Sequence, residues 1–376
     1  MAGSVHPIKV MHIIDKLSMD GINPSSCATL FGEWIPRLDA DGFSTTVLTL
    51  RKPDFAGKYL EDKGVKVYYQ GHGKVSFKNV HGIMDVMDQE RPDIVHLHGY
   101  SAANFGRIAA RKKGVKNIVH EHAVLNVLPY QYVADFLLRN HTDSAIAVSN
   151  SVKEFMVRGR NIPEEKINVI QNGIRLDLFN KRDFNIVSEK KSELGIEEGY
   201  RVVGTVTRLR REKGVEYFIR SIPSVLQEFP ETIFIIAGDG PMKDEMEQLV
   251  NNLDIPKQVK FLGFRKDVPD LLSTFDINVM PSLSEGFPLS LIEAMAIGNA
   301  IVATEVGGIK EVGEEGITVL FVPPKDPKAI ADKVCYLFKS KDIFLKLSNN
   351  ARVNSAKYSI ESNVLSLVDH YTKILK

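Results

Sequence analysis

The sequence predicts an α/β protein made of two doubly wound domains, and three observations support this. The chain has 376 residues, which is more than a single hydrophobic core usually serves. Short β-branched runs alternate with longer helical patterns, which is typical of parallel sheets covered by helices. This alternation stops near residue 172 and restarts at residue 200, which indicates two sheets facing each other across a cleft.

Each half contains a series of predicted strands. In the first half the strands are expected at 8–14, 44–50, 65–69, 93–98, 117–122, 144–149 and 167–172, with helices at 25–40, 77–90, 101–113 and 149–159. In the second half they are expected at 200–209, 232–238, 258–263, 277–281, 300–304 and 318–322. Ligands of such folds bind beyond the carboxyl ends of the strands, so the residues there are the first candidates for a site.

The same patterns set the expected domain boundaries. We divide the chain into an N-terminal domain (1–175), a polar linker (176–199), a C-terminal domain (200–357) and a final helix (358–376). The last segment has apolar residues at helical spacing, so we expect a helix that crosses back to the first domain.

Composition narrows the class of protein. Apolar residues make up 44% and charged residues 25% of the chain, which is ordinary for a soluble globular protein. The net charge of +1 gives no support for a nucleic-acid partner. Cys27 and Cys335 lie in different predicted domains, so we expect no disulfide framework and a cytoplasmic location. No apolar run approaches the roughly 20 residues that a membrane span needs, and no signal peptide is recognised.

Two common phosphate-binding motifs are missing. The first predicted strand is followed by DKLSMDGINPSS, and the first strand of the second half by TRLRREKG. Neither stretch has the three glycines of G-x-G-x-x-G, and no G-x-x-x-x-G-K-[ST] is present. A dinucleotide-binding or P-loop protein is therefore disfavoured, and any phosphate must be held in another way.

The segment from Glu285 to Glu293, EGFPLSLIE, supplies such a way. Pro288 suits the first turn of a helix, and Gly286 lets the backbone approach a ligand closely. The free amides of a helix start attract phosphate. Two carboxylates eight positions apart reach different parts of one ligand. A phosphate flanked by groups that accept hydrogen bonds from hydroxyls indicates a sugar nucleotide.

Two other strand ends of the second half add to this pattern. Arg208 and Lys213 place positive charge just past a strand, where both can turn toward a diphosphate. Gly238 and Asp239 lie in a glycine-rich turn whose backbone can pass under a ligand. Taken alone, the first stretch is a solvated basic turn and the second a tight turn.

Together these segments resemble the donor-binding domain of a family-4 GT-B retaining glycosyltransferase. The resemblance is carried over roughly 200–325 by TRLRREKGVEYFI, IIAGDGP, VKFLGFRKDVPDLL and FDINVMPSLSEGFPLSLIEAMAIGNAIVATEVGGIKEV. The first half is similar more loosely, through KVMHII, PDIVHLH, AIAVSNSV and VIQNGI. The resemblance implies a donor-binding C-terminal domain and an acceptor-binding N-terminal domain.

The same resemblance implies an activity. It is the retaining, metal-independent transfer of a hexose-type sugar from a nucleotide-diphosphate sugar, most often a UDP-sugar, to a hydroxyl acceptor. The acceptor is a glycan, a lipid-linked sugar or a small molecule, and no cofactor is expected.

The resemblance also assigns roles to residues of this chain. Arg208 and Lys213 match the positions that stabilise the departing diphosphate, Glu285 the carboxylate that faces the transferred sugar, and Glu293 the one that binds the ribose. Further donor contacts are expected from Gly238, Asp239, Phe264, Gly286, Phe287, Pro288 and Leu289, with Phe264 near the base.

Histidines dominate the candidate residues of the first half. His96 and His98 share one face of a predicted strand, and His120 and His122 share a face of another. Four such side chains on adjacent strand ends could bind zinc, although partly buried histidines at a cleft edge are commoner. The family pattern places a histidine near the reacting centre, and His122 fits it best, so we expect a catalytic role there.

One loop departs from the family pattern. Relatives often carry a Gly-Gly-x-Glu turn after the first strand, near the donor phosphates. Here the stretch 18–25 retains only Gly21, which we expect to approach the phosphates, either without the usual glutamate or in a loop reshaped around an unusual acceptor.

A basic cluster raises the question of a membrane partner. Arg107, Arg111, Lys112, Lys113 and Lys116 are expected at one helix end. Such a cluster fits peripheral contact with an anionic membrane, although a solvated helix end, where cations complement the helix dipole, is the favoured interpretation.

Other activities stay open at this stage. A glycosidase also uses two carboxylates, but it has no need of Arg208, Lys213 or a phosphate-binding helix start. A nucleotide-sugar epimerase or hydrolase, or a sugar-nucleotide-binding protein without catalysis, would use the same fold.

Overall fold

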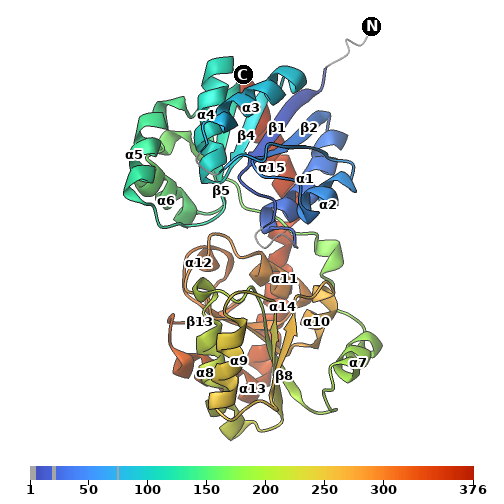
Figure 1. Cartoon of the computed structure of the whole chain (residues 1–376). Helices are drawn as coiled ribbons and strands as arrows, with labels where there is room; N and C mark the ends of the chain where they lie inside the picture. Colours follow the sequence, from blue (N-terminus) through green and yellow to red (C-terminus); the bar gives the residue numbers. More distant parts are fainter. Residues whose placement is uncertain (1–5, 19–22, 74–75) are drawn as a thin grey trace. The chain divides into compact units, whose positions relative to one another are not determined.

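The computed structural model describes residues 6–18, 23–73 and 76–376, which fold into two α/β units (Figure 1). Unit 1 contains the chain up to Gln171 together with Ile360–Lys376, and unit 2 contains Asn172–Ser359. Unit 1 has a parallel sheet in the order β3-β2-β1-β4-β5-β6-β7, and unit 2 one in the order β10-β9-β8-β11-β12-β13. The predicted fold class, two doubly wound α/β sheets, is confirmed.

Unit 1 contains a strand at each of the predicted places. They are β1 (Ile8–Ile14), β2 (Phe43–Thr49), β3 (Lys66–Tyr69), β4 (Ile94–His98), β5 (Lys116–Glu121), β6 (Ser144–Ala147) and β7 (Ile167–Val169). Strand order reverses at β1, which pairs with both β2 and β4. The register sets His12 opposite His96 and His98 opposite His120. Histidines of three neighbouring strands therefore share one face of the sheet.

The helices of unit 1 cover this sheet. They are α1 (Ser26–Ala40), α2 (Phe55–Glu61), α3 (Lys78–Glu90), α4 (Tyr100–Lys113), α5 (Pro129–Leu138) and α6 (Asn150–Arg160). Helix α1 begins after Ser25, whose hydroxyl accepts a hydrogen bond from the amide of Ala28 at 3.2 Å. The sequence did not predict α2 and α5.

The final helix, α15 (Ile360–Leu375), follows unit 2 in sequence but belongs to unit 1. Its Asn363 accepts a hydrogen bond from the indole of the fully buried Trp34 at 2.6 Å. Asn363 also donates to the carbonyl of Gln171 at 2.6 Å. The last residues of the chain therefore complete the core that the first ones begin.

Unit 2 repeats the pattern with β8 (Arg201–Val206), β9 (Thr232–Ala237), β10 (Val259–Gly263), β11 (Ile277–Met280), β12 (Ala300–Thr304) and β13 (Leu320–Val322). Its helices are α7 (Phe184–Glu193), α8 (Val215–Glu228), α9 (Lys243–Asn252), α10 (Val268–Thr274), α11 (Leu289–Ile297), α12 (Ile309–Val312), α13 (Pro327–Lys339) and α14 (Lys341–Ser355). Strand order reverses at β8, which pairs with both β9 and β11. In doubly wound sheets ligands bind at such a switch point.

The polar stretch between the sheets has its own structure. Helix α7 packs on α10 within unit 2, where Arg182 pairs with Asp270 at 2.6 Å and Lys190 with Asp267 at 2.9 Å. Among the described residues, no helix is long and apolar enough to cross a membrane.

Candidate functional site

Glycines allow two strand-end loops of unit 2 to touch backbone to backbone. Gly238 follows β9 with φ +135°, and a Cβ there would lie 1.8 Å from the carbonyl oxygen of Thr207. The next residues lock together, because the amide of Leu209 donates to the carbonyl of Asp239 at 2.9 Å. Only glycine fits this approach, so the loop after β8 is held in place by the one after β9.

A second close approach fixes the loop after β11. Gly307 has φ +44°, and a Cβ there would lie 2.1 Å from the carbonyl oxygen of Glu285. A Cβ on Gly308 would lie 2.2 Å from the carbonyl of Gly286. The amide of Gly308 donates to the Glu285 carbonyl at 3.0 Å. The Gly-Gly turn thus supports the backbone on which Glu285 stands.

The centre of the site is an ion pair between the two supported loops. Lys213 Nζ lies 2.6 Å from Glu285 Oε1, which also accepts a hydrogen bond from Ser282 Oγ at 2.7 Å. Glu285 is 8% exposed, and Lys213 ends the short helix η4 (Arg211–Lys213). The sequence predicted that Lys213 contacts the diphosphate and that Glu285 faces the transferred sugar. It did not predict that the two side chains contact each other.

Helix α11 begins one residue later than predicted. Pro288 has ψ 89° and occupies the N-cap position, so Leu289 is the first helical residue and Pro288 is not in the first turn. The buried Phe287 contacts the ring of Tyr358, which packs the segment before the helix into unit 2. Helix α11 therefore begins from a backbone that this packing fixes.

Glu293 lies in the second turn of α11 and is half-buried. Burial raises the pKa of its carboxyl to about 7. Within the described chain its carboxylate has no hydrogen-bond or ion-pair partner. A carboxyl in this state gains free energy from a ligand hydroxyl that donates to it.

The remaining predicted donor residues occupy neighbouring strand ends. Arg208 is exposed after β8, and Asp239 is exposed after β9, where its carboxylate accepts from the amide of Gly240 at 2.7 Å. Phe264 follows β10 and is 51% exposed. Gly21 lies outside the described residues.

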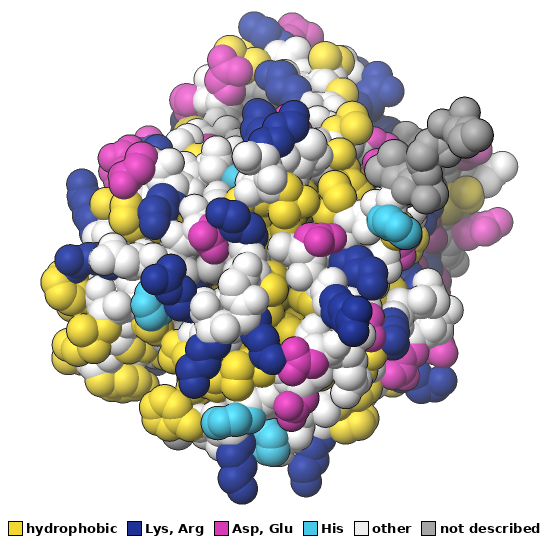
Figure 2. Space-filling model, turned by 90° about the horizontal axis from the view of Figure 1, so that it is seen from above, with side chains coloured by type: hydrophobic (Ala, Val, Ile, Leu, Met, Phe, Trp, Pro, Cys, Tyr) yellow, Lys and Arg dark blue, Asp and Glu magenta, His cyan; other side chains and the backbone are white. Residues whose placement is uncertain are grey.

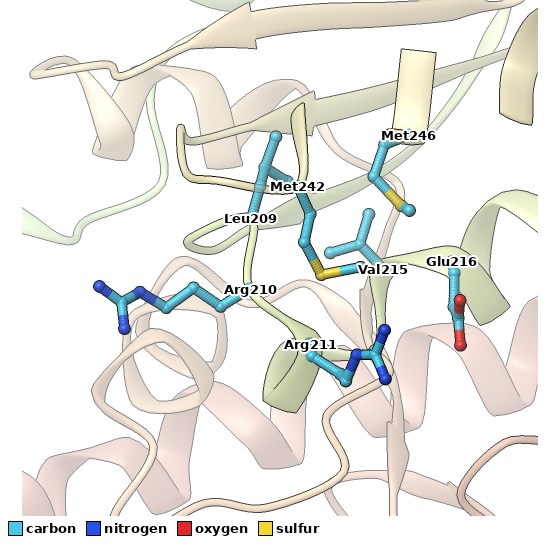
Figure 3. Close-up of a pocket in the computed structure, with 8 residues that line it drawn as sticks. Leu209, Arg210, Arg211, Val215, Glu216, Met242 and Met246 are labelled. Atoms are coloured by element: carbon cyan, nitrogen blue, oxygen red, sulfur yellow. The ribbon is translucent and has the colours of Figure 1, made fainter. Parts of the chain in front are cut away.

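A small hollow lies behind the loop after β8, but it is not this site. Figure 3 shows Met242, Met246 and Val215 converging on it, with Arg210 turned away. The predicted donor-binding residues do not line it.

In unit 1, five histidines form a layer between the sheet and helices α1 and α15. His12 Nδ1 contacts His98 Nε2, and His98 Nδ1 contacts His122 Nε2, both at 3.0 Å. In a separate contact of the same layer, His96 Nε2 lies 3.0 Å from His120 Nδ1. His96 also contacts the hydroxyl of Tyr371, and the ring of Trp34 stacks on His120.

This layer differs from the predicted histidines at a cleft edge. His12, His96, His98 and His120 are fully buried, and His122 is half-buried after β5. The predicted grouping on adjacent strands is confirmed, since the nitrogens of His98, His120 and His122 lie within 4.8 Å of one another. His12 completes a second such trio with His96 and His98, and sequence reasoning missed it. The alternation in IKVMHII was the available signal.

Burial keeps these histidines neutral. It lowers the pKa of His12 to about 3 and of His122 to about 4, and it lowers the pKa values of His96, His98 and His120 well below the usual value. Three ring nitrogens in the described layer are buried without a partner: His12 Nε2, His120 Nε2 and His122 Nδ1.

The predicted basic cluster is smaller than expected. Arg107 is fully buried and pairs with Asp135 of α5, so it is not a surface cation. Lys113 contacts Asp88 at 2.6 Å. Arg111 and Lys112 are exposed at the end of α4.

Comparison with known families assigns each half of the chain. The family "Glycosyl transferases group 1" matches residues 187–354, and "Glycosyltransferase Family 4" matches residues 28–178. The chain is 32% identical over 247 residues to an uncharacterized glycosyltransferase of Methanocaldococcus jannaschii, covering 64% of this chain and 62% of that protein. It is 30% identical over 247 residues to the UDP-Gal:alpha-D-GlcNAc-diphosphoundecaprenol alpha-1,3-galactosyltransferase of Escherichia coli, covering 61% of this chain and 62% of that protein. The matched region thus spans a little under two thirds of each of these relatives.

The fold is shared with solved structures. The Anabaena protein HepE, solved in complex with UDP, superposes with a TM-score of 0.85 at 20% identity, over 97% of this chain and 100% of that one. At that identity the likeness establishes the two-domain fold.

Proposed function

The chain belongs to the group 1 and family 4 glycosyltransferases of the GT-B fold, and we propose that it transfers a hexose-type sugar from a nucleotide-diphosphate sugar to a hydroxyl acceptor. The observation that carries this proposal is the contact of Lys213 with Glu285 ahead of α11, at the switch point of the unit 2 sheet. A cation, a carboxylate and a helix start therefore lie on neighbouring loops, and close glycine contacts hold the backbone of these loops in place.

The cations act on the leaving group. When the bond between the sugar C1 and the phosphate oxygen breaks, negative charge grows on the diphosphate. Lys213, Arg208 and the first amides of α11 stabilise that charge, because they are in position before the reaction starts. These groups supply the positive charge that a divalent metal would otherwise bring, so the proposed reaction needs neither metal nor cofactor.

The two carboxylates bind the donor. Glu285, turned toward the sugar, accepts hydrogen bonds from its hydroxyls, and Glu293 accepts them from the ribose. Because Glu285 shares its charge with Lys213 and Ser282, it is a weak nucleophile. We therefore propose retention by front-face attack, in which the acceptor oxygen bonds to C1 and its proton passes to the departing phosphate oxygen.

The nucleotide is proposed to be a UDP-sugar. HepE was solved with UDP, and the name of the Escherichia coli relative specifies a UDP-galactose donor. Phe264 offers an exposed ring for the base. That relative's named acceptor is a sugar on diphosphoundecaprenol, which makes a lipid-linked hydroxyl the first acceptor to test, ahead of glycans and small molecules.

A thermal-shift panel of UDP-, GDP- and ADP-sugars identifies the donor. A ligand that binds only the folded state stabilises that state, by about 2.7 kcal/mol at a ligand concentration of 100 Kd. This stabilisation raises the melting temperature. We expect a UDP-sugar to give the largest shift, and a larger shift with another base would correct the choice. Release of UDP without a transferred sugar would indicate a hydrolase, and binding without turnover on any acceptor would indicate a non-catalytic protein.

Paired substitutions separate the roles of the carboxylates. Glu293→Ala is expected chiefly to weaken donor binding, and Glu285→Ala chiefly to slow transfer. Glu245→Ala, on the exposed face of α9, is the matched control. If both site variants lost only acceptor affinity, the proposed donor site would be wrong. Because the proposed reaction needs no metal, we also expect sugar transfer to continue after treatment with a chelator.

A further inference from the structure

Helix α5 reverses the usual amphipathic pattern of a helix on the surface of a globular domain. Its one fully buried residue is Asp135, while its large apolar side chains face outward. Leu137 is 69% exposed and Tyr130 58% exposed. The exposed apolar residues of α5 and the loop before it, which we call the α5 surface, are Val124, Leu125, Leu128, Tyr130, Tyr132, Val133, Phe136 and Leu137.

Buried ion pairs fix α5 on unit 1. Asp135 lies between the buried guanidinium groups of Arg107 and Arg160, with Arg160 Nε 2.6 Å from its carboxylate. Arg160 also pairs with Glu121 of β5, and Arg107 Nη1 donates to Thr142 at 3.3 Å. Three neighbouring elements thus fix the orientation of α5. The outward apolar face is therefore built into the fold.

The α5 surface is free of acidic groups. From His122 to Thr142 the only acidic residue is Asp135, which is buried. Arg139 follows the helix, with its guanidinium 3.8 Å from the centre of the Phe136 ring. Arg111 lies one turn beyond Arg107 on α4, which packs against α5, and it is exposed together with Lys112. Figure 2 shows hydrophobic side chains along its left margin, the side on which α5 lies in Figure 1, with Lys and Arg side chains among them.

We propose that the α5 surface docks on an anionic lipid bilayer. Solvent-exposed apolar patches of this kind mark interaction sites. A ten-residue helix is too short to span a bilayer, but it can lie in the interface with its apolar side chains among the acyl chains. Tyrosines suit the level of the lipid headgroups, and Arg139, Arg111 and Lys112 complement anionic headgroups. This proposal rests on the α5 surface and the cations beside it, and it does not depend on the proposed sugar transfer.

Flotation of the full-length chain with vesicles tests the proposal. One set of vesicles contains phosphatidylcholine alone, and the other adds phosphatidylglycerol. We expect the unaltered chain to bind the anionic vesicles. For the double variant Val133→Glu, Leu137→Glu we expect the partition coefficient to fall at least about tenfold relative to the unaltered chain. Both side chains are exposed, so the fold is retained. The matched control is Leu365→Glu on α15, an exposed leucine of the same unit that lies outside the α5 surface.

Each other outcome overturns the proposal. Absence of flotation with both sets of vesicles would contradict it, as would flotation that the double variant does not reduce. A dimer that the same double variant disrupts, in light scattering without lipid, would show that a second copy covers the α5 surface. Equal binding to neutral and anionic vesicles would remove the assigned role of Arg139, Arg111 and Lys112.

Discussion

In unit 2 the strand ends carry charged side chains that are paired or exposed, whereas in unit 1 neutral histidines near the strand ends are buried under α1 and α15. Lys213 and Glu285 form an ion pair, with Nζ 2.6 Å from Oε1. The buried histidines are neutral because charging them would leave an ion without water. Two sheets of the same class therefore differ in what they offer a ligand: fixed charge in one, neutral donors and acceptors in the other.

The largest expected effect of this difference is acid lability of unit 1. The unfolded chain takes up protons on histidine below about pH 6.5, while the folded histidines stay neutral, so stability is full above that pH and falls below it. Each fully buried histidine then costs about 2 kcal/mol at pH 5, and four together cost on the order of 8 kcal/mol. This is comparable with the whole stability of a typical domain.

Urea unfolding between pH 7 and pH 5 measures this effect. In His12→Gln we expect the slope of stability against pH to fall by about 1.4 kcal/mol per pH unit below 6.5. The control is His81→Gln, which removes an exposed histidine. Equal slopes in the two variants would contradict the assignment to the buried layer.

The next largest effect is expected for the cations of unit 2. Arg208→Ala and Lys213→Ala each remove a group that stabilises the departing diphosphate, so kcat should fall about 10²–10³-fold. Release of the nucleoside diphosphate from the donor chosen by thermal shift provides the measurement. Arg211→Ala, in the same loop and exposed, should stay within a few-fold of the unaltered chain. A comparable loss in that control would mean that general surface charge is responsible.

A smaller effect is expected from the glycine that supports Glu285. Gly307→Ala forces a Cβ to within 2.1 Å of the Glu285 carbonyl oxygen, so the backbone must move. Gly316→Ala also lies at positive φ but meets no atom within 4 Å, and it isolates the cost of the strained φ alone. We expect the first variant to be less stable than the second by about 1–3 kcal/mol in chemical denaturation, with weaker donor binding. Equal losses would show that the close approach is unimportant.

The smallest effect is expected for His122. If this residue acts near the acceptor, His122→Ala should lower kcat about 10–100-fold while donor affinity is kept. His81→Ala serves as the surface control. A transfer rate unchanged by the first substitution would leave His122 as a member of the buried layer only.

The sequence predicted both sheets because their strands are β-branched runs bounded by turn residues, and such runs have few alternative structures. It did not predict α5, because a helix that turns Asp135 inward and most of its large apolar side chains outward reverses the usual amphipathic pattern. Local pattern carries no signal for a partner that lies far along the chain.

The same limit applies to the site. Residue type, position after predicted strands and the family resemblance selected Arg208, Lys213, Glu285 and Glu293. The structure places all four on strand ends or on the helix that follows β11. The direct contact of Lys213 with Glu285 joins residues 72 positions apart, so no spacing rule could reveal it. His12 was missed because its partners, His96 and His98, become neighbours only through the strand order.

The position of α15 has a consequence for how the chain is made. Most of unit 1 is synthesised before unit 2, but Asn363 and Tyr371, which close over Trp34 and the histidine layer, are synthesised after unit 2. Unit 2, which is continuous in sequence, can finish its core before unit 1 does. Unit 1 therefore cannot complete its core until α15 has been synthesised after unit 2, and until then its polar layer stays open to solvent and to chaperones.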